Sequence, residues 1–571
     1  MSRYAVALLV AGLAVVLTSL AAPAIAAPRP TPSAPTSPTV PVGRDWLRLT
    51  LDSQQPRMVT ATDTSVTVTG TLTNISDRRI RQITTRLQVG DPVTGTSALR
   101  SALSPTANYT HGNTVFTPVP GGLDPGQSVS FTVSADLTGP DSLRVTRPGV
   151  YPLLVNVQGV PDFSTIGYRL VVASMLLPVL AVHDGNQPAP ASSPAKLTVL
   201  WPLIDQQPRI LSSGNQLVLS DDTLATSLAP GGRLFGLLDA VRQASGSDPG
   251  LLSALCFAID PDLLATVQGM TAGYQVSTGS GTSQPGTGAA AAGLWLATLK
   301  TLAAGRCVLA LPYADTDLTA LAHAGGTGLL QLALTDGTAA VRGLGGDTLT
   351  TVAWPADNAM DTRTMTDLAG AGTHTVLLNP DSVTPTVTGP APLAGFTGGN
   401  APMVVPIDPV VSAALAPRAD EPNVNAQAIS AQDGLAALVY RTVFTQRGDS
   451  VLVAPPRRWA PSPAEALEFL RDTSTVLAGH YATATALSDA VSGQQAGPAV
   501  TLNYPPQQSL AEVAPQVVSG AVRSDAAARD VLAAMGRDHT TPTPVPPSAL
   551  VDPVRLDLLR AVSSAWRDNR T

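Results

Sequence analysis

Aspartates close a series of apolar segments in the middle of this 571-residue chain. Each segment is a short apolar run that ends on one or two aspartates, as in "CFAIDPDLL" at 256–264. The aspartates are Asp205, Asp260 with Asp262, Asp315 with Asp317, Asp357, Asp381 and Asp408. Carboxylates that converge on one site suit a glycosidase, which needs one as acid and another as nucleophile or base. They also suit a divalent cation.

The two aspartates of each pair invite different interpretations. Asp262 and Asp317 stand just before helical sequence. A carboxylate there accepts a first-turn N–H and interacts favourably with the helix dipole. Asp260 and Asp315 lie at the strand end itself. We therefore take Asp260 and Asp315 as catalytic candidates, assisted by Asp357 or Asp408; the alternative is that all of them only terminate strands and cap helices.

Further candidates for ligand binding lie close to the same segment ends. They are Asp205, Tyr313, Trp354, Arg457, Arg458 and Trp459. The aromatic residues suit a carbohydrate surface, and are equally expected in a core. Arg457 and Arg458 suit bidentate binding of a carboxylate or phosphate; alternatively, they pair with the aspartates.

Other chemistry lacks the residues that it needs. The six histidines are scattered without metal-type spacing, and we find no nucleophile elbow, phosphate loop or dinucleotide fingerprint. We expect no metal and no cofactor. The net charge of −7 carries no basic footprint, so we expect no nucleic-acid partner.

The segments that carry these residues alternate with helical sequence over 196–480. Continuous apolar runs separated by helices predict parallel strands buried on both faces. Seven such units favour a seven-stranded β/α barrel, with the aspartates at its mouth; a doubly wound open sheet is the alternative. Residues 277–288 are expected to form a flexible surface insertion, and residues 481–571 a helical region on the outside of the barrel.

The region before the barrel has a different pattern. Residues 44–183 contain short alternating segments separated by Pro-Gly turns, which predict an immunoglobulin-like β-sandwich. Pro-rich linkers are expected at 27–43 and 184–195. The chain is thus predicted to be multidomain, with 44% hydrophobic and 13% charged residues, a composition that forms cores.

The N-terminus predicts export. Residues 1–26 contain Arg3, an apolar run and an Ala-x-Ala site, as in a secretory signal peptide; a retained anchor is the alternative. No later segment reaches the ~18 apolar residues of a membrane helix, so we expect no transmembrane span in the mature chain. Cys256 and Cys307 begin two strand-like runs and form either one disulfide or two buried thiols.

These motifs together resemble a known family. "GTLTN", "PGVYPLLVNVQG", "WPLID", "FAIDPDLL", "LPYADTDLTAL" and "WPAD" are similar to the secreted actinobacterial proteins of domain of unknown function family 6049. The resemblance implies a cell-envelope protein, often encoded beside the lipid II flippase. Members usually continue into a β-domain and a membrane helix, so a chain ending at Thr571 is expected to be truncated or to have lost its anchor.

The barrel also resembles those of family 57 glycoside hydrolases and polysaccharide deacetylases. Those enzymes use strand-end His with Glu or Asp, whereas "WPLID" replaces the His-x-His strand here and no Glu ends a strand. The resemblance implies a degenerate barrel. We expect an envelope protein that binds a cell-wall glycan or a protein partner without catalysis; the alternatives are a carbohydrate-active hydrolase and a purely structural role.

Overall fold

The computed structural model describes residues 45–567, except 104–107, 184, 186, 213–215, 280, 397–400, 419–422, 446–447, 493–496 and 536–545. The predicted signal peptide and the first linker lie outside the described residues. Within the described part, no helix is both long and apolar enough to span a bilayer.

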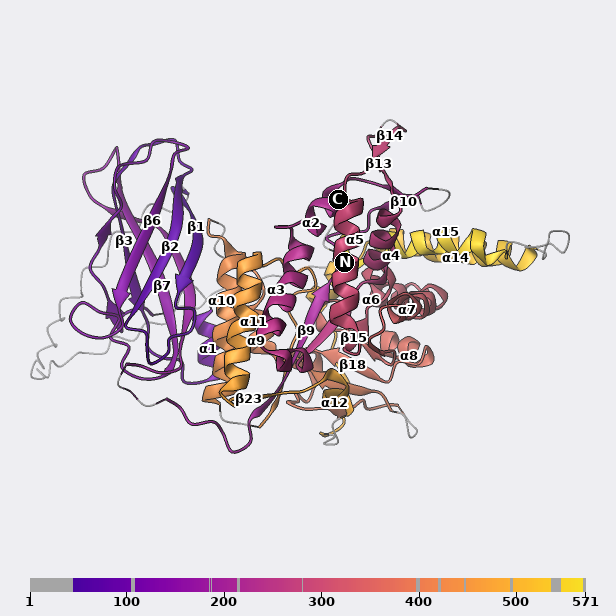
Figure 1. Ribbon diagram of the computed structural model, residues 1–571. Coiled ribbons are helices and arrows are strands. Elements are labelled where there is room, and N and C mark those ends of the chain that lie inside the picture. The colour runs from indigo at the N-terminus through magenta and orange to yellow at the C-terminus, as the bar shows by residue number, and fades with distance from the viewer. Residues whose placement is uncertain are drawn as a thin grey trace, which may run out of the picture.

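Two antiparallel sheets form the N-terminal part of the chain, drawn in indigo and purple in Figure 1. One has the order β1-β2-β6; the other has the order β4-β3-β7-β8, with β5 beside β3. Buried residues alternate along the whole of β2, as they do when one face of a strand covers a core. The strands are β1 (Leu47–Gln55), β2 (Ser65–Asn74), β3 (Ile80–Val89), β4 (Gly112–Asn113), β5 (Thr117–Pro118), β6 (Ser128–Asp136), β7 (Gly149–Pro161) and β8 (Tyr168–Val179), with helix α1 (Thr96–Ala102) after β3.

Parallel strands form the centre of the rest of the chain. One sheet has the order β16-β15-β12-β9-β22, with β23 beside β9, and a second has the order β17-β18-β21-β20. Every residue of β12 is buried, because helices cover both faces of such a sheet. The strands are β9 (Ala195–Leu203), β12 (Leu255–Ile259), β15 (Cys307–Ala310), β16 (Asp347–Leu349), β17 (Val352–Ala353), β18 (Thr375–Leu378), β20 (Ala391–Pro392), β21 (Met403–Pro406), β22 (Ser450–Val453) and β23 (Ala482–Ala484).

The parallel strands do not form one continuous ladder. All pair in parallel except β20, which runs antiparallel to β21. The ladder breaks between β16 and β17, which follow each other along the chain. It breaks again between β21 and β22, where the Asp408 N–H donates to the Leu452 carbonyl at 2.7 Å. Each of the seven apolar segments nevertheless forms a strand, and their carboxyl ends lie on one face, which we call the strand-end face.

Helices follow most of these strands. Asp260 and Pro261 show how one begins: the Asp260 side chain accepts the Asp262 N–H at 3.0 Å, and proline occupies the first helical position. The helices are α2 (Thr223–Leu228), α3 (Arg233–Ser247), α4 (Pro261–Thr271), α5 (Ala289–Ala303), α6 (Leu318–His323), α7 (Thr327–Arg342), α8 (Thr362–Gly370), α9 (Pro409–Ala414), α10 (Ala426–Val439), α11 (Pro463–Ala478) and α12 (Leu487–Ser492).

Short strands outside the parallel sheets form two further small sheets. The segment expected to be a flexible insertion contains a hairpin, which joins a four-stranded sheet at its edge. That sheet consists of β10 (Ile210–Ser212), β11 (Val218–Leu219), β13 (Gln275–Ser277) and β14 (Ser283–Pro285). Strands β19 (Val383–Thr384) and β24 (Thr501–Leu502) pair with each other.

A disulfide joins two neighbouring parallel strands. Cys256 on β12 and Cys307 on β15 are bonded, with their Cα atoms 4.7 Å apart. The register of the two strands places Phe257 opposite Val308, so the preceding cysteines also face each other. Of the two alternatives for these cysteines, the structure contains the bonded one.

Helices α10 and α11, drawn in orange in Figure 1, stand between the antiparallel sheets and β9. Two residues of α10 hold the edge of β8: Asp433 accepts the Leu176 N–H at 2.8 Å, and Gln432 donates to the Leu176 carbonyl at 3.0 Å. These buried bonds satisfy backbone groups that would otherwise be costly to bury. The two parts of the chain therefore meet through specific polar contacts.

The last helices depart from their expected position. Helices α14 (Pro515–Ala534) and α15 (Ser548–Ala561) form a hairpin that projects from the body (Figure 1, yellow), preceded by α13 (Pro506–Ala511). Residues after α15 return to the strand-end face, where the Asp317 N–H donates to the Val562 carbonyl at 2.9 Å. Placement on the outside is therefore wrong for residues 560–567. The predicted boundary at 480 also differs, because β23 extends the parallel sheet.

Asp472 on α11 makes stability depend on pH. Burial and the nearby Glu468 raise the pKa of Asp472 to about 7. Because this pKa exceeds the unfolded value of about 3.9, the folded state binds more protons between about pH 4 and pH 7. Stability therefore falls as pH rises through that window. We expect Asp472→Asn to raise the free energy of unfolding at pH 8 by up to about 4 kcal/mol, measured by urea titration, with little change at pH 4.

Asp347→Asn is the matched control, since Asp347 is exposed on β16. Equal effects of the two variants at pH 8 would contradict this role of Asp472.

Candidate functional site

The strand-end face gathers most of the aspartates that the sequence singles out. Their shared property is burial; all but Asp357 and Asp381 are largely removed from solvent. The buried ones are Asp205, Asp260, Asp262, Asp315, Asp317 and Asp408. Burial of an ionised carboxylate is costly unless a cation or several hydrogen bonds compensate. The partners of each aspartate therefore decide what this face can do.

Asp260 caps α4, a role that we assigned to Asp262. Its carboxylate accepts the Asp262 N–H at 3.0 Å, and it forms no ion pair with any residue that the structure describes. Burial, together with the neighbouring Asp262 and Asp315, raises the pKa of Asp260 well above its usual range. Asp260 is therefore a buried carboxyl group whose environment favours its neutral form.

Asp262 is a partner of the last long helix and not a cap. Arg560 on α15 donates from Nε to Asp262 at 2.8 Å and from a terminal nitrogen to the Tyr313 hydroxyl at 2.9 Å. Burial raises the pKa of Asp262, while Arg560 acts in the opposite direction. Arg560 thus links Asp262 to Tyr313.

Asp315 lies at the centre of a second cluster. It pairs with Arg457 and with Arg458, the latter at 3.0 Å, and it accepts the Ser564 hydroxyl. Its side chain is only 2% exposed. Arg457 and Arg458 thus both pair with Asp315, which is enclosed by its partners.

Asp317 and Asp357 share one guanidinium. Asp317 caps α6 by accepting the Ala320 N–H at 3.2 Å, and it pairs with Arg567 at 3.0 Å. Arg567 also pairs with Asp357 at 2.8 Å. Burial raises the pKa of Asp317, whereas the side chain of Asp357 remains 43% exposed.

The two remaining buried aspartates are also satisfied by local partners. Asp408 caps α9 through the Val410 and Val411 N–H groups, at 3.0 and 2.9 Å, and pairs with Arg441 at 2.6 Å. Asp205 pairs with Arg209 at 2.5 Å. Neither carboxylate needs a ligand to account for its position.

Two loops of the strand-end face adopt a conformation that is rare for side chains with a Cβ. Ala314 and Asp315 after β15 have φ of 56° and 47°, and Asp357 and Asn358 after β17 have φ of 53° and 57°. Consecutive left-handed residues of this kind cost of order 1–3 kcal/mol each and gather at functional sites. The surrounding ion pairs and hydrogen bonds hold both loops in place.

The aromatic residues divide into two groups. Tyr313 and Trp459 are buried; Trp459 packs edge-on against Trp201, with ring centroids 5.5 Å apart. Trp354 is also buried but lies against a cavity, with the Arg457 guanidinium 4.7 Å from its ring centroid. Neither Tyr313 nor Trp459 is exposed as a platform for a sugar.

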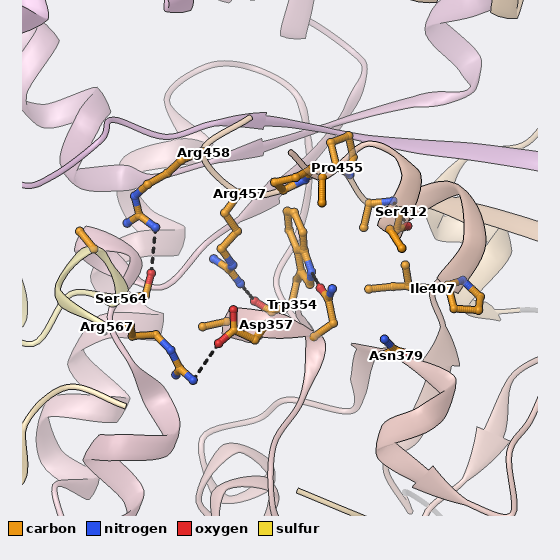
Figure 2. Close-up of a pocket in the computed structure, with 18 residues that line it drawn as sticks. Trp354, Asp357, Asn379, Ile407, Ser412, Pro455, Arg457, Arg458, Ser564 and Arg567 are labelled. Atoms are coloured by element: carbon orange, nitrogen blue, oxygen red, sulfur yellow. Dashed lines mark hydrogen bonds and ion pairs between the residues drawn. The ribbon is translucent and has the colours of Figure 1, made fainter. Parts of the chain in front are cut away.

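One half of the strand-end face opens into a cavity of about 470 Å³, shown in Figure 2. Asp357, Trp354, Arg457 and Arg458 line it, whereas the other predicted site residues do not. The guanidinium groups gather on one side, and Ser412 and Ile407 lie on the other. The predicted residues outside the lining are Asp205, Asp260, Tyr313, Asp315, Asp408 and Trp459.

The cavity includes residues that sequence reasoning missed. Ser564 and Arg567 reach it from the C-terminal region, about which the local pattern says nothing. Asn379 directly follows β18, so the strand-end rule should have selected it instead of the exposed Asp381. The side-chain Oδ1 of Asn379 accepts the Asp381 N–H at 3.1 Å, which leaves the side-chain amide nitrogen for the cavity.

Comparison with known proteins identifies the family. The profile of the "Family of unknown function (DUF6049)" matches residues 1–543. The chain belongs to this family. The resemblance inferred from its motifs is therefore confirmed. The comparison with curated proteins found no match.

Solved structures give likenesses at low sequence identity. A 4-alpha-glucanotransferase from Thermococcus litoralis shares 10% identity over 59% of this chain and 46% of that chain, with a TM-score of 0.38. A Mycobacterium smegmatis protein described as a polysaccharide deacetylase shares 15% identity over 56% of this chain and 99% of that chain, with a TM-score of 0.35. A β-glucosidase from Listeria innocua shares 17% identity over 24% of this chain and 16% of that chain, with a TM-score of 0.16.

The described carboxylates of the strand-end face are not arranged as a metal site. Among the residues that the structure describes, no three or more His, Cys, Asp and Glu side chains are arranged to hold a metal ion. The carboxylates face arginines and backbone N–H groups instead. The buried carboxylates of the face are thus neutralised or hydrogen-bonded, and Asp357 is the carboxylate that remains half exposed.

The buried Arg560–Asp262 ion pair is expected to contribute to the stability of the fold. Arg560→Leu leaves Asp262 buried without its cation, so we expect the free energy of unfolding to fall by about 3 kcal/mol or more. Replacing both residues by leucine should recover most of the loss. Urea unfolding measures all three proteins.

Arg529→Leu serves as the control, because Arg529 pairs with Asp525 on α14 with its side chain 53% exposed. We expect this variant to lose less than about 1 kcal/mol. Similar losses for Arg560→Leu and Arg529→Leu would refute the importance of the buried pair.

Proposed function

We propose that this protein is an exported, envelope-associated member of its family that binds a cell-wall glycan in the 470 Å³ cavity and does not transform it. The observation that carries the proposal is the saturation of the strand-end carboxylates by arginines and helix N-termini. A glycosidase needs two carboxyl groups, about 5–10 Å apart, that both reach the substrate. Of the described residues that line the cavity, Asp357 is the one carboxylate.

The hydrolase alternative is therefore less well supported. Asp260 and Asp315, which we took as its catalytic pair, lie outside the cavity lining. Asp315 is engaged by two guanidiniums and a hydroxyl. A carboxylate held this way is poorly placed to act as a nucleophile or to accept a proton.

A glycan fits the shape and composition of the cavity. Its volume falls in the range of about 300–1,000 Å³ that is typical of small-molecule sites. One wall is apolar, from Ile407, Pro455 and neighbouring alanines and prolines, and the rest carries hydrogen-bonding side chains. Such a concave site is better suited to a sugar unit than to the surface of a folded protein, which favours a glycan over a protein partner.

The scaffold and its location form part of the same proposal. We infer that the seven apolar segments belong to a barrel whose ladder is interrupted at two seams, and that the N-terminal sheets form an immunoglobulin-like sandwich. The Asp408-to-Leu452 hydrogen bond across one seam supports the barrel. The Ala-x-Ala site and the disulfide support export, since disulfides persist in oxidising compartments.

Filling the cavity tests the binding proposal. Ala413 on α9 is exposed and lines the cavity, so Ala413→Trp should block it without disturbing an ion pair. We expect binding of peptidoglycan fragments, measured by calorimetry, to fall at least about 10-fold. The control Ala297→Trp, at an exposed position of α5, should bind as wild type does.

If wild type binds no fragment, or if Ala413→Trp binds as tightly as wild type, the cavity is not a glycan site.

Export is tested separately. We expect the chain, expressed in an actinobacterial host, to be recovered outside the cytoplasm with Ala27 as its first residue, as determined by N-terminal sequencing. Recovery from the cytoplasm with residues 1–26 intact would contradict export.

A further inference from the structure

The cavity presents positive charge more than negative charge. Three of its lining side chains are guanidiniums, from Arg457, Arg458 and Arg567, against the single carboxylate of Asp357. Figure 2 shows these groups on one side of the cavity, with Asn379 and Ser412 away from them. The side facing a bound molecule is therefore rich in N–H donors.

Two of the three carboxylates that pair with these arginines lie behind them, and the third, Asp357, lines the cavity beside Arg567. Asp315 pairs with Arg457 and Arg458, and Asp317 pairs with Arg567. The side chains of the two aspartates are 2% and 1% exposed, whereas that of Arg458 is 21% exposed. A molecule in the cavity consequently meets the guanidinium of Arg458 and the carboxylate of Asp357, whereas the arginines separate it from Asp315 and Asp317.

Arg457 also has a hydrogen-bonding site to spare. Its two terminal nitrogens donate to Asp315 and to the Trp354 carbonyl. Its Nε is buried and has no hydrogen-bond partner in the described structure, although buried N–H groups are nearly always paired. Burial lowers the pKa of Arg457, so a nearby anion would offset part of the cost of burying this charge.

We propose that the ligand of this cavity is an acidic sugar, whose oxyanion group is bound by Arg458 and Arg457 while Asp357 accepts its hydroxyls. This inference rests on the proposed glycan binding and adds the class of ligand. A planar carboxylate matches the fork of a guanidinium, and a phosphate uses the same donors. Both are included because the recognising chemistry is shared.

Three sugars that differ in one group test the class of ligand. N-acetylglucosamine is neutral, N-acetylmuramic acid adds a lactyl carboxylate, and N-acetylglucosamine 6-phosphate adds a phosphate. We expect at least one acidic sugar to bind about 10-fold or more tightly than the neutral one, as charge-assisted hydrogen bonds imply. Calorimetry with the full chain at low salt measures all three.

The outcomes separate the two proposals. If the three sugars bind alike, the acidic class is wrong while glycan binding stands. If none of them binds, and peptidoglycan fragments fail as well, both proposals fall. If only the phosphate gains affinity, the oxyanion is a phosphate and not a carboxylate.

Variants locate the anion in this cavity. Arg458→Gln should reduce binding of the acidic sugar about 10-fold and leave the neutral sugar unchanged. Arg471→Gln is the control, since Arg471 pairs with Glu468 on the surface of α11. An acidic sugar that binds Arg458→Gln as tightly as wild type would overturn the assignment.

A second pair of variants changes an exposed residue and leaves the ion pairs of the face in place. Ala413→Glu places a carboxylate at the edge of the cavity, and Ala413→Gln places a neutral group of the same shape there. We expect Ala413→Glu to weaken the acidic sugar about 10-fold relative to Ala413→Gln, with no difference for the neutral sugar. Equal binding of the acidic sugar by both variants would also overturn the proposal.

Discussion

The need to compensate buried carboxylates organises the strand-end face. Parallel strands end on aspartates that the packing of α4, α6 and α9 removes from water, and an uncompensated carboxylate there would cost several kcal/mol. The chain meets this need in two ways: helix N-termini bind Asp260, Asp317 and Asp408, and arginines pair with all but the first of these buried groups. Asp260, which lacks a cation in the described structure, is instead shifted towards its neutral form.

Some of the partners of these carboxylates come from the other end of the chain. Arg560 reaches Asp262 across 298 residues, and Ser564 reaches Asp315 across 249. These contacts fix residues 560–567 on the strand ends, so the projecting hairpin of α14 and α15 is anchored at its root. Long-range ion pairs and hydrogen bonds thus cover the strand ends at one edge of the sheet.

The local sequence pattern was enough to predict the strands, but not the partners of the aspartates at their ends. Continuous apolar runs such as "CFAID" predict buried parallel strands, because only those are covered on both faces. Asp260 and Asp262 show the limit: both stand at a strand end before a helix, and only three-dimensional packing decides that the first caps α4 and the second meets Arg560. The roles of Ser564 and Arg567 were beyond sequence reasoning, since their partners lie about 250 residues away.

The two halves of the strand-end face differ in how exposed their carboxylates are. Around Asp262 and Asp315 the carboxylates are paired with arginines of the chain, and Tyr313 and Trp459 are buried. Around Asp357 the backbone is held in a left-handed conformation at two consecutive residues, yet the carboxylate remains half exposed beside an open cavity. Asp357 is held from one side by Arg567 at 2.8 Å, so its strained loop keeps a carboxylate at the cavity without enclosing it, which is where strained backbone gathers in functional sites.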